Sequence, residues 1–254
     1  APTCPAPINV IASSSGTLDS VDLTWTETGE ATEWEIVYGP TGFDIATEGI
    51  TLTDNDGTLG HTITGLNTDT AYEFYVRAIC AADDVSDWED VEFFTGYCES
   101  VPTSNDGTGI ELIEIGVNDF LSGGDITYED FTGTTVDLPR AVEANVIVTF
   151  DHTYGYGTNI WIDFNNDLVF DDTELLIAGQ SNDLDPNVAD VSFMMPIDAP
   201  LGIHRMRIGT ADYGQDTPNP CYNGSYGVTA DFTVNILEAP SCLAPTNLTV
   251  QELT

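Results

Sequence analysis

The stretch "AYEFYVRA", residues 71–78, alternates bulky apolar side chains with mostly polar or charged ones. A period of two places Tyr72, Phe74 and Val76 on one face of an extended strand, where they can enter a core. The same alternation occurs in "VDLTW", residues 21–25, and in "WEIVY", residues 34–38. Turn-forming clusters such as "TDNDGTLG" and "GLNTDT" separate such runs. Short strands between turns predict an all-β chain of antiparallel sandwiches with essentially no helix.

The composition of the chain supports a folded protein and excludes several partners. With 254 residues and 41% hydrophobic content, two domains of ordinary size can each bury a core. The formal net charge is −39, and all four basic residues are arginines. Such a surface repels phosphate backbones and anionic membranes, so we expect neither nucleic-acid binding nor membrane binding. No segment approaches the roughly 18 apolar residues of a membrane span.

Five cysteines, at positions 4, 80, 98, 221 and 242, show neither a CxxC nor a Cys/His spacing, which argues against zinc. Widely separated cysteines in an acidic chain without lysine favour disulfides in an oxidising, extracellular environment. The chain opens with "APTCPAPINV" and has no signal-peptide pattern there, so we expect it to be a processed piece of a longer protein.

The opening ten residues recur near the other end. "APTCPAPINV", residues 1–10, and "APSCLAPTNL", residues 239–248, are identical at six of ten positions, with Cys4 aligned to Cys242, 238 residues later. Self-similarity at a fixed spacing is the mark of a repeat array. The chain is therefore expected to hold one full unit and the first strand of the next.

Residues 1–96 resemble a fibronectin type III domain. The resemblance rests on "CPAPINV", "VDLTWT", "WEIVYGPTGF", "ITGLNTDTAYEFYVRAICAADDVSDW" and the closing "FFT", which occur in the family's order. Trp25 matches the buried tryptophan of the second strand. Leu66 and Tyr72 match the corner at which a tyrosine hydroxyl binds the backbone. Cys4 and Cys80 match a bacterial subgroup that carries cysteines at these positions.

Residues 97–236 resemble the GEVED family of β-sandwich modules, found in large secreted proteins of Bacteroidetes. The matching stretches are "YCESVPTSNDGTGIELIEIG", "WIDFNNDLVFDDTELL", "PLGIHRMRIGTADYG", "PNPC" and "YGVTADFTVNI". In the name motif Gly227 and Asp231 are kept, whereas Val228 and Ala230 replace the two glutamates.

These resemblances imply a domain plan. We expect an immunoglobulin-like fibronectin type III domain at 1–96, a jelly-roll-like GEVED sandwich at 97–237, and the first strand of a second fibronectin type III repeat at 238–254. One disulfide per domain is expected, Cys4–Cys80 and Cys98–Cys221, with Cys242 left for a partner beyond the chain.

The stretch "WIDFNNDLVFDDTELL", residues 161–176, crowds oxygen ligands between two apparent strands. In the spacing of a calcium loop that begins at Asp163, five side-chain positions and one carbonyl position fall on Asp163, Asn165, Asp167, Asp171, Glu174 and Val169. The sixth position, usually glycine, is Leu168. The alternative is an acidic hairpin tip without an ion. We favour calcium, because hard cations suit such oxygen clusters, with the modest affinity of extracellular sites.

No catalytic set can be assembled from the motifs. The three histidines, at 61, 152 and 204, belong to no HExxH motif, and no serine lies in a GxSxG turn. Arg205 and Arg207 are expected to neutralise neighbouring carboxylates. Trp88, Trp161 and Tyr213 could line a sugar-binding face, although core packing is the first expectation for each.

We therefore expect a non-catalytic repeat of a giant extracellular adhesin or cell-surface filament, with other repeats of the same chain as partners. The resemblance to these families implies a Bacteroidetes source and export by the type IX pathway. Its chains could assemble into a homo-oligomeric filament, and its ligand could be a glycan or another cell-surface molecule. The alternative is an accessory substrate- or glycan-binding region of a secreted protease or glycoside hydrolase. The number of repeats in the full reading frame distinguishes the two.

Overall fold

The computed structural model describes residues 4–100, 102–105 and 109–241. The chain folds into two compact units. The first runs to Tyr97 and also includes the short segment Asn166–Val169, and the second begins at Cys98 and holds the other described residues. The regular elements of the described residues are all strands, so none of these residues forms a helix that could cross a membrane. The all-β fold expected from the sequence is confirmed.

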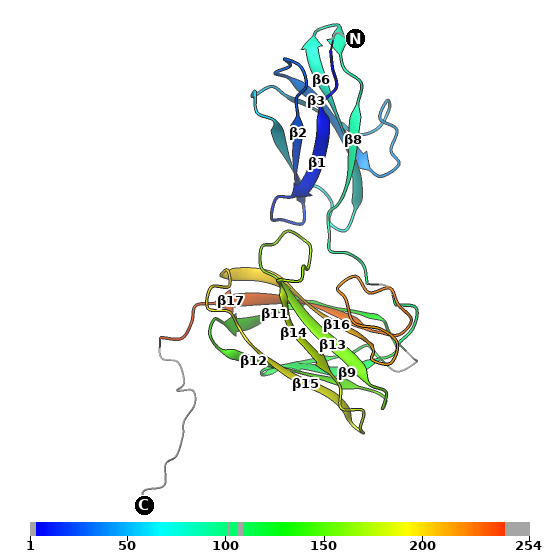
Figure 1. Cartoon of the computed structure of the whole chain (residues 1–254), viewed down its shortest axis with the longest axis vertical. Coiled ribbons are helices and arrows are strands. Elements are labelled where there is room, and N and C mark those ends of the chain that lie inside the picture. Colours follow the sequence, from blue (N-terminus) through cyan, green and yellow to red (C-terminus); the bar gives the residue numbers. More distant parts are fainter. Residues whose placement is uncertain (1–3, 101, 106–108, 242–254) are drawn as a thin grey trace, which may run out of the picture. The chain divides into compact units, whose positions relative to one another are not determined.

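The first unit consists of two antiparallel sheets (Figure 1). One has the order β1-β2-β5 and is formed by β1 (Ile8–Ser14), β2 (Ser20–Thr26) and β5 (Gly60–Thr64). The other has the order β4-β3-β6-β7, and β8 also pairs with β6. Its members are β4 (Ile50–Asp54), β3 (Trp34–Pro40), β6 (Ala71–Ala81), β7 (Asp84–Val85) and β8 (Glu89–Phe94).

The period-two faces read from the sequence form the core of the first unit. Tyr72, Phe74 and Val76 of β6 are buried together with the apolar positions of β2 and β3. The rings of Trp25 and Trp34 join the two sheets with centroids 5.4 Å apart. Burial of such aromatic side chains dominates the stability of small sandwiches.

The corner before β6 has the geometry expected of a fibronectin type III domain. Leu66 is buried, and the backbone N–H of Asn67 donates a hydrogen bond to the Tyr72 hydroxyl oxygen at 3.0 Å. This bond satisfies a backbone donor in a turn, where no strand can pair with it.

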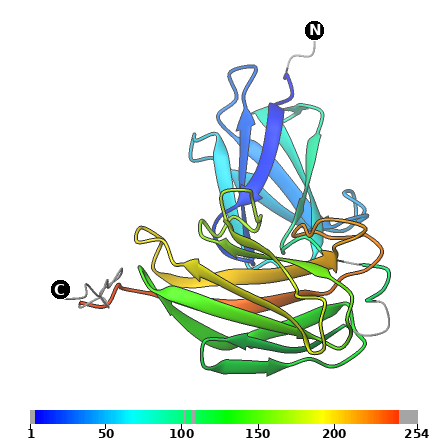
Figure 2. The same ribbon diagram turned by 60° about the horizontal axis from the view of Figure 1, so that its bottom comes forward.

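The second unit is a sandwich of two sheets that lie face to face (Figure 2). The four-stranded sheet has the order β10-β9-β12-β15, with β9 (Ile110–Ile115), β10 (Asn118–Leu121), β12 (Glu143–Phe150) and β15 (Asn187–Met194). The five-stranded sheet has the order β11-β17-β16-β13-β14. Its strands are β11 (Tyr128–Pro139), β13 (Tyr156–Asp163), β14 (Leu175–Gln180), β16 (Gly202–Asp212) and β17 (Thr229–Leu237).

One strand pair departs from the antiparallel pattern that the sequence predicted. β11 and β17 run parallel, from Tyr128 opposite Thr229 to Pro139 opposite Leu237, with an irregularity between Phe131 and Thr135. About ninety residues separate the two strands, so no tight turn forces them to run in opposite directions. The sequence holds no local signal for such a distant pairing.

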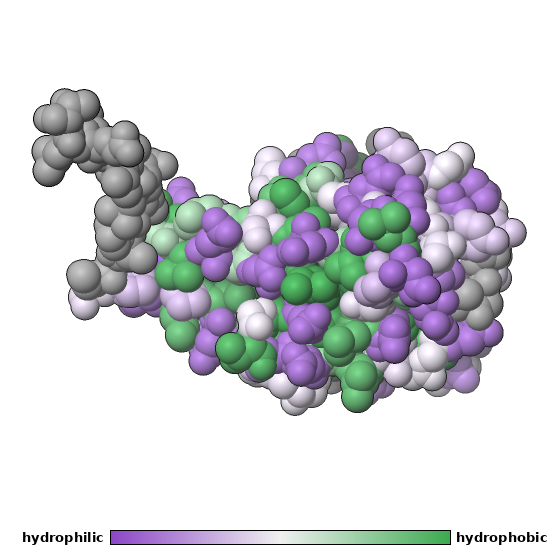
Figure 3. Space-filling view, turned by 90° about the horizontal axis from the view of Figure 1, so that it is seen from below, coloured by the Kyte–Doolittle hydropathy of each residue, from purple (hydrophilic) through white to green (hydrophobic). Residues whose placement is uncertain are grey.

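The core of the second unit lies between its two sheets. Phe120, Phe131 and Phe232 pack against one another with centroids 5.0–5.3 Å apart. β13 is buried at all eight positions, whereas β12 alternates between buried and partly exposed residues. On the face seen in Figure 3, hydrophobic side chains are interspersed with hydrophilic ones, as strands with one solvated face require.

The structure joins Cys4 to Cys80 and Cys98 to Cys221, the two pairs that the sequence predicted. Cys242 and most of the expected next strand lie outside the described residues.

Candidate calcium loop and buried arginine–aspartate cluster

The candidate calcium loop connects β13 with β14. Asp163 is the last residue of β13, where it pairs with Arg205 of β16 in the strand register, and its side chain is fully buried. Glu174 directly precedes β14 and is 4% exposed. The other four predicted ligands lie on the connection between them, so the two ends of the ligand set are held by the sheet.

Glu174 accepts hydrogen bonds from the loop backbone. Its Oε1 accepts the N–H of Phe164 at 2.8 Å, and its Oε2 accepts the N–H of Asp171 at 3.2 Å. Burial raises the pKa of Glu174, and the nearby carboxylate of Asp163 raises it further, while the backbone hydrogen bonds oppose both effects. The structure therefore brings two buried carboxylates of the predicted set together.

Asp167 and Asp171 shape the loop locally. Asp167 Oδ1 accepts the N–H of Val169 at 2.9 Å, and Asp171 Oδ1 accepts both the N–H and the hydroxyl of Thr173 at 2.6 Å. Such bonds to a residue two positions on are Asx turns, which aspartate forms without an ion. They also lower the pKa of Asp171.

Leu168 takes the backbone conformation of the glycine that it replaces. Its φ is +69°, in the left-handed region that a branched side chain rarely occupies. The sharp turn at the sixth loop position therefore forms despite the missing glycine. Within the described residues no group of three or more His, Cys, Asp or Glu side chains is placed to hold a metal. Calcium stays a prediction.

A buried cluster around Asp231 explains why this residue of the name motif is kept. Asp231 is 1% exposed and Arg207 is 2% exposed. Arg207 binds the carboxylate through two bonds, Nε to Oδ1 at 2.6 Å and Nη2 to Oδ2 at 2.7 Å. Arg205 Nη1 lies 3.2 Å from Oδ2, and the Tyr128 hydroxyl donates to the same oxygen at 3.0 Å. Both arginines thus neutralise a carboxylate, as the sequence predicted.

Arg207 also holds the two chain segments that the second disulfide joins. Its Nη1 donates to the carbonyl oxygens of Cys98 and Pro220, each at 2.7 Å. The planar guanidinium can serve four acceptors at once because its five N–H groups point in fixed directions. Sequence reasoning missed these carbonyl contacts, because nothing in the chain links position 207 to positions 98 and 220.

The remaining candidate side chains have packing roles, with one exception. His204 places its ring nitrogens 3.0 and 3.2 Å from the carbonyl oxygens of Asp163 and Pro200. Trp161 is 4% exposed, and the ring of Trp88 lies 4.3 Å from the guanidinium carbon of Arg77. Tyr213 is 63% exposed. Of the three aromatic residues considered for sugar binding, Tyr213 is the most exposed, Trp88 is partly buried and Trp161 is buried.

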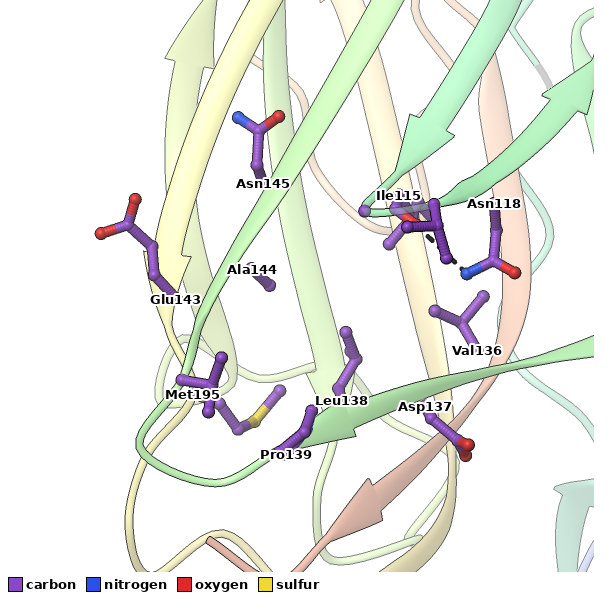
Figure 4. Close-up of a pocket in the computed structure, with 13 residues that line it drawn as sticks. Ile115, Asn118, Val136, Asp137, Leu138, Pro139, Glu143, Ala144, Asn145 and Met195 are labelled. Atoms are coloured by element: carbon purple, nitrogen blue, oxygen red, sulfur yellow. Dashed lines mark hydrogen bonds between the residues drawn. The ribbon is translucent and has the colours of Figure 1, made fainter. Parts of the chain in front are cut away.

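An apolar pocket of about 320 Å³ lies in the second unit, beside the β9–β10 and β11–β12 turns (Figure 4). Ile115, Val136 and Leu138 are among the aliphatic residues that line it. Its two carboxylates, Asp137 and Glu143, come from different strands and point away from each other in Figure 4. They do not form the facing pair that acid–base catalysis on one substrate requires.

Comparison with family models identifies two domains in the predicted order. The fibronectin type III domain model matches residues 5–91, and the GEVED domain model matches residues 157–235. No curated protein matches the chain.

Solved structures resemble about a third to two fifths of the chain. The fibronectin type III domain of the human collagen alpha-1(XX) chain is 24% identical, covers 41% of this chain and 96% of its own, and has a TM-score of 0.33. The FN5 domain of Drosophila Lar is 23% identical, covers 36% and 98%, and has a TM-score of 0.30. A structure described as a myokine is 21% identical, covers 36% and 97%, and has a TM-score of 0.32.

Domains of these two kinds are typically non-catalytic, and together with the two disulfides they indicate an extracellular, repeat-like region. The chain carries a fibronectin type III domain at residues 5–91, followed by a GEVED domain at residues 157–235.

Proposed function

We propose that this chain is a tension-bearing repeat of a large extracellular adhesin or cell-surface filament. The observation that carries the proposal is the position of the two disulfides along the chain. Cys4 precedes the first strand of the first unit, and Cys80 lies near the end of β6. Cys98 precedes the first strand of the second unit, and Cys221 lies between β16 and β17. Each bridge therefore begins near the start of its unit.

This arrangement gives tension a short covalent path. When the chain is pulled by its ends, tension that reaches Cys4 crosses directly to Cys80, follows the backbone to Cys98, and crosses to Cys221. Residues 5–79 and 99–220 then lie in closed loops that carry no tension. The stretched parts are the residues before Cys4, the segment between Cys80 and Cys98, and the segment after Cys221. A protein that must hold a cell against flow or drag benefits from such limited extension.

The loaded segment after Cys221 is firmly anchored. β17 pairs with β16 on one side and with β11 on the other. Asp231 of β17 forms the buried ion pair with Arg207 of β16. Breaking a buried pair of this kind leaves an uncompensated charge in the core, which costs about 3–5 kcal/mol. Displacement of β17 must therefore break two ladders and a buried ion pair together.

We include calcium in the proposal as a stabiliser of the β13–β14 loop. The support is the pair of buried carboxylates at Asp163 and Glu174, whose mutual repulsion a divalent cation would relieve. The left-handed conformation of Leu168 supports it further, because calcium loops need that turn at their sixth position.

The wider setting follows from the repeated sequence and the two domain types. The recurrence of the opening ten residues supports other repeats of the same chain as neighbours. We propose that the source is a member of the Bacteroidetes that exports the protein through the type IX pathway and displays it on the cell surface. Side-by-side assembly of such chains would give a filament.

The test of this function is the complete reading frame, followed by location of the protein on cells. Many copies of the unit, with antibody labelling along extracellular filaments of intact cells, are expected. A single copy beside a catalytic domain would contradict the filament and identify the chain as an accessory region of a secreted enzyme.

A further inference from the structure

A second, more polar pocket lies in the second unit, on the β13–β14 edge of its five-stranded sheet. It has a volume of about 380 Å³ and is lined by residues of β13, β14 and the connection between β16 and β17. In each of two facing pairs that line it, one residue is small, with Gly157 opposite Gln180 and Asn159 opposite Ala178.

The connection after β16 forms one wall of the pocket and is held against the sheet. The Asn159 side-chain amide donates a hydrogen bond to the carbonyl oxygen of Pro218 at 3.1 Å. A Cβ atom on Gly157 would lie 3.0 Å from Pro218 Cδ, so glycine at this position allows the close approach. The wall is therefore held against the sheet by specific contacts.

The pocket has an aromatic side chain that packing does not use. Tyr213 is anchored through its backbone N–H, which donates to the carbonyl oxygen of Gly155 at 2.8 Å, while its side chain is 63% exposed. Within the described part of the chain, its ring and hydroxyl have no hydrogen-bond or stacking partner. An anchored, solvent-exposed aromatic face is a stacking surface for the C–H groups of a sugar ring.

Polar groups around the same pocket are free to bind a hydroxylated ligand. Neither the side-chain amide of Gln180 nor the hydroxyl of Thr217 forms a hydrogen bond with another described residue. Asp216 is exposed, and one of its oxygens accepts only the adjacent Thr217 N–H at 2.8 Å. An amide, a hydroxyl and a carboxylate beside an aromatic ring supply the donors and acceptors that vicinal hydroxyl groups require.

Charge restricts the class of ligand. The chain has no lysine, and its four arginines all form ion pairs, Arg77 with Glu35, Arg140 with Glu238, and both Arg205 and Arg207 with Asp231. No cation lines this pocket, and the formal charge of the chain is −39. Uronates, sialosides and sulfated or phosphorylated sugars are therefore repelled.

We propose that this pocket is a binding site for a neutral sugar, with Tyr213 as the stacking residue and Gln180 and Asp216 as the groups that bind its hydroxyls. The proposal goes beyond the tension-bearing role and is independent of it. Loss of sugar binding would leave the disulfides and their mechanical effect unchanged.

The test uses the full chain and named neutral probes. Maltotriose, cellotriose, mannotriose and lactose would be titrated by isothermal calorimetry and by NMR, with trigalacturonate as the anionic comparison. We expect at least one neutral probe to bind and trigalacturonate not to bind. Tyr213→Ala should weaken binding about tenfold, the size of effect that loss of one aromatic contact gives. Tyr213→Phe should retain most of it.

Tyr154→Ala is the matched control, because Tyr154 is also an exposed tyrosine of the second unit, at 57%, and does not line the pocket. It should bind the probe as well as the unchanged chain does, and Gln180→Ala and Asp216→Asn should each weaken binding. The proposal is overturned if none of the four neutral probes binds at millimolar concentration. It is also overturned if Tyr154→Ala and Tyr213→Ala weaken binding equally while both keep the melting temperature of the original chain.

Discussion

Removal of the disulfides should lengthen the chain under load by an amount that the structure fixes. Cys4 and Cys80 are 76 residues apart in sequence and 5.7 Å apart between Cα atoms. Cys98 and Cys221 are 123 residues apart and 5.4 Å apart. An extended chain spans at most about 3.3–3.6 Å per residue. While it is intact, the first bridge therefore prevents about 250 Å of contour length from extending, and the second prevents about 420 Å.

Two double variants each remove one bridge. The first combines Cys4→Ser with Cys80→Ser, and the second combines Cys98→Ser with Cys221→Ser. The assay is single-molecule force spectroscopy with handles at both ends of the chain. The oxidised chain should release only short increments, because the closed loops cannot extend. Each double variant should add its own increment, and reduction of the original chain should add both.

The same changes should lower stability in solution. The loop-entropy relation gives about 4.5 kcal/mol for the first bridge and about 4.9 kcal/mol for the second, as upper values. Arg207 also links the two segments that the second bridge joins, because it binds the carbonyl oxygens of Cys98 and Pro220 independently of the sulfur atoms. The second unit should therefore still fold without its bridge. If the oxidised chain already releases several hundred ångströms, the proposed force path is wrong.

Three further predictions concern the second unit. Asp231→Asn should destabilise the chain by about 3–5 kcal/mol in chemical denaturation, because Arg207 would lose the buried carboxylate that neutralises it, whereas the exposed Asp130→Asn should change stability little. Calcium at 10 mM should stabilise the original chain by about 1.4 kcal/mol, if the affinity is about 1 mM. Asp171→Asn should reduce this gain, and Asp172→Asn, outside the ligand positions, should not. The pKa of Glu174 is raised in the folded chain, so without calcium its contribution to stability should fall as the pH rises through that pKa. The increase in stability on adding calcium should grow over the same pH range. Equal calcium shifts in both variants would mean that the ion only screens charge.

Features of the fold that depend on the local alternation of apolar and polar residues could be predicted from the sequence. Alternation placed Tyr72, Phe74 and Val76 in the core, since a period of two has only one face to bury. The two cysteine pairings followed from the family resemblances, which imply two domains with one bridge in each. The parallel pairing of β11 with β17 could not be predicted in this way, because it depends on which strands meet across the whole unit.

Asp231, the aspartate of the name motif that this chain keeps, has a structural role that the sequence did not reveal. In the sequence, Val228 and Ala230 replace the two glutamates of the motif, and Asp231 is kept. In the structure these two positions are buried and apolar, whereas Asp231 between Ala230 and Phe232 faces the opposite side of β17 and accepts hydrogen bonds from Arg205, Arg207 and Tyr128. The surviving residue is thus the one whose loss would leave a buried guanidinium unpaired, at a cost of several kcal/mol. The glutamate positions can change to apolar residues because they enter a core that accepts them. In this chain Asp231 therefore supports strand β17 within its sheet, through its ion pair with Arg207 of β16.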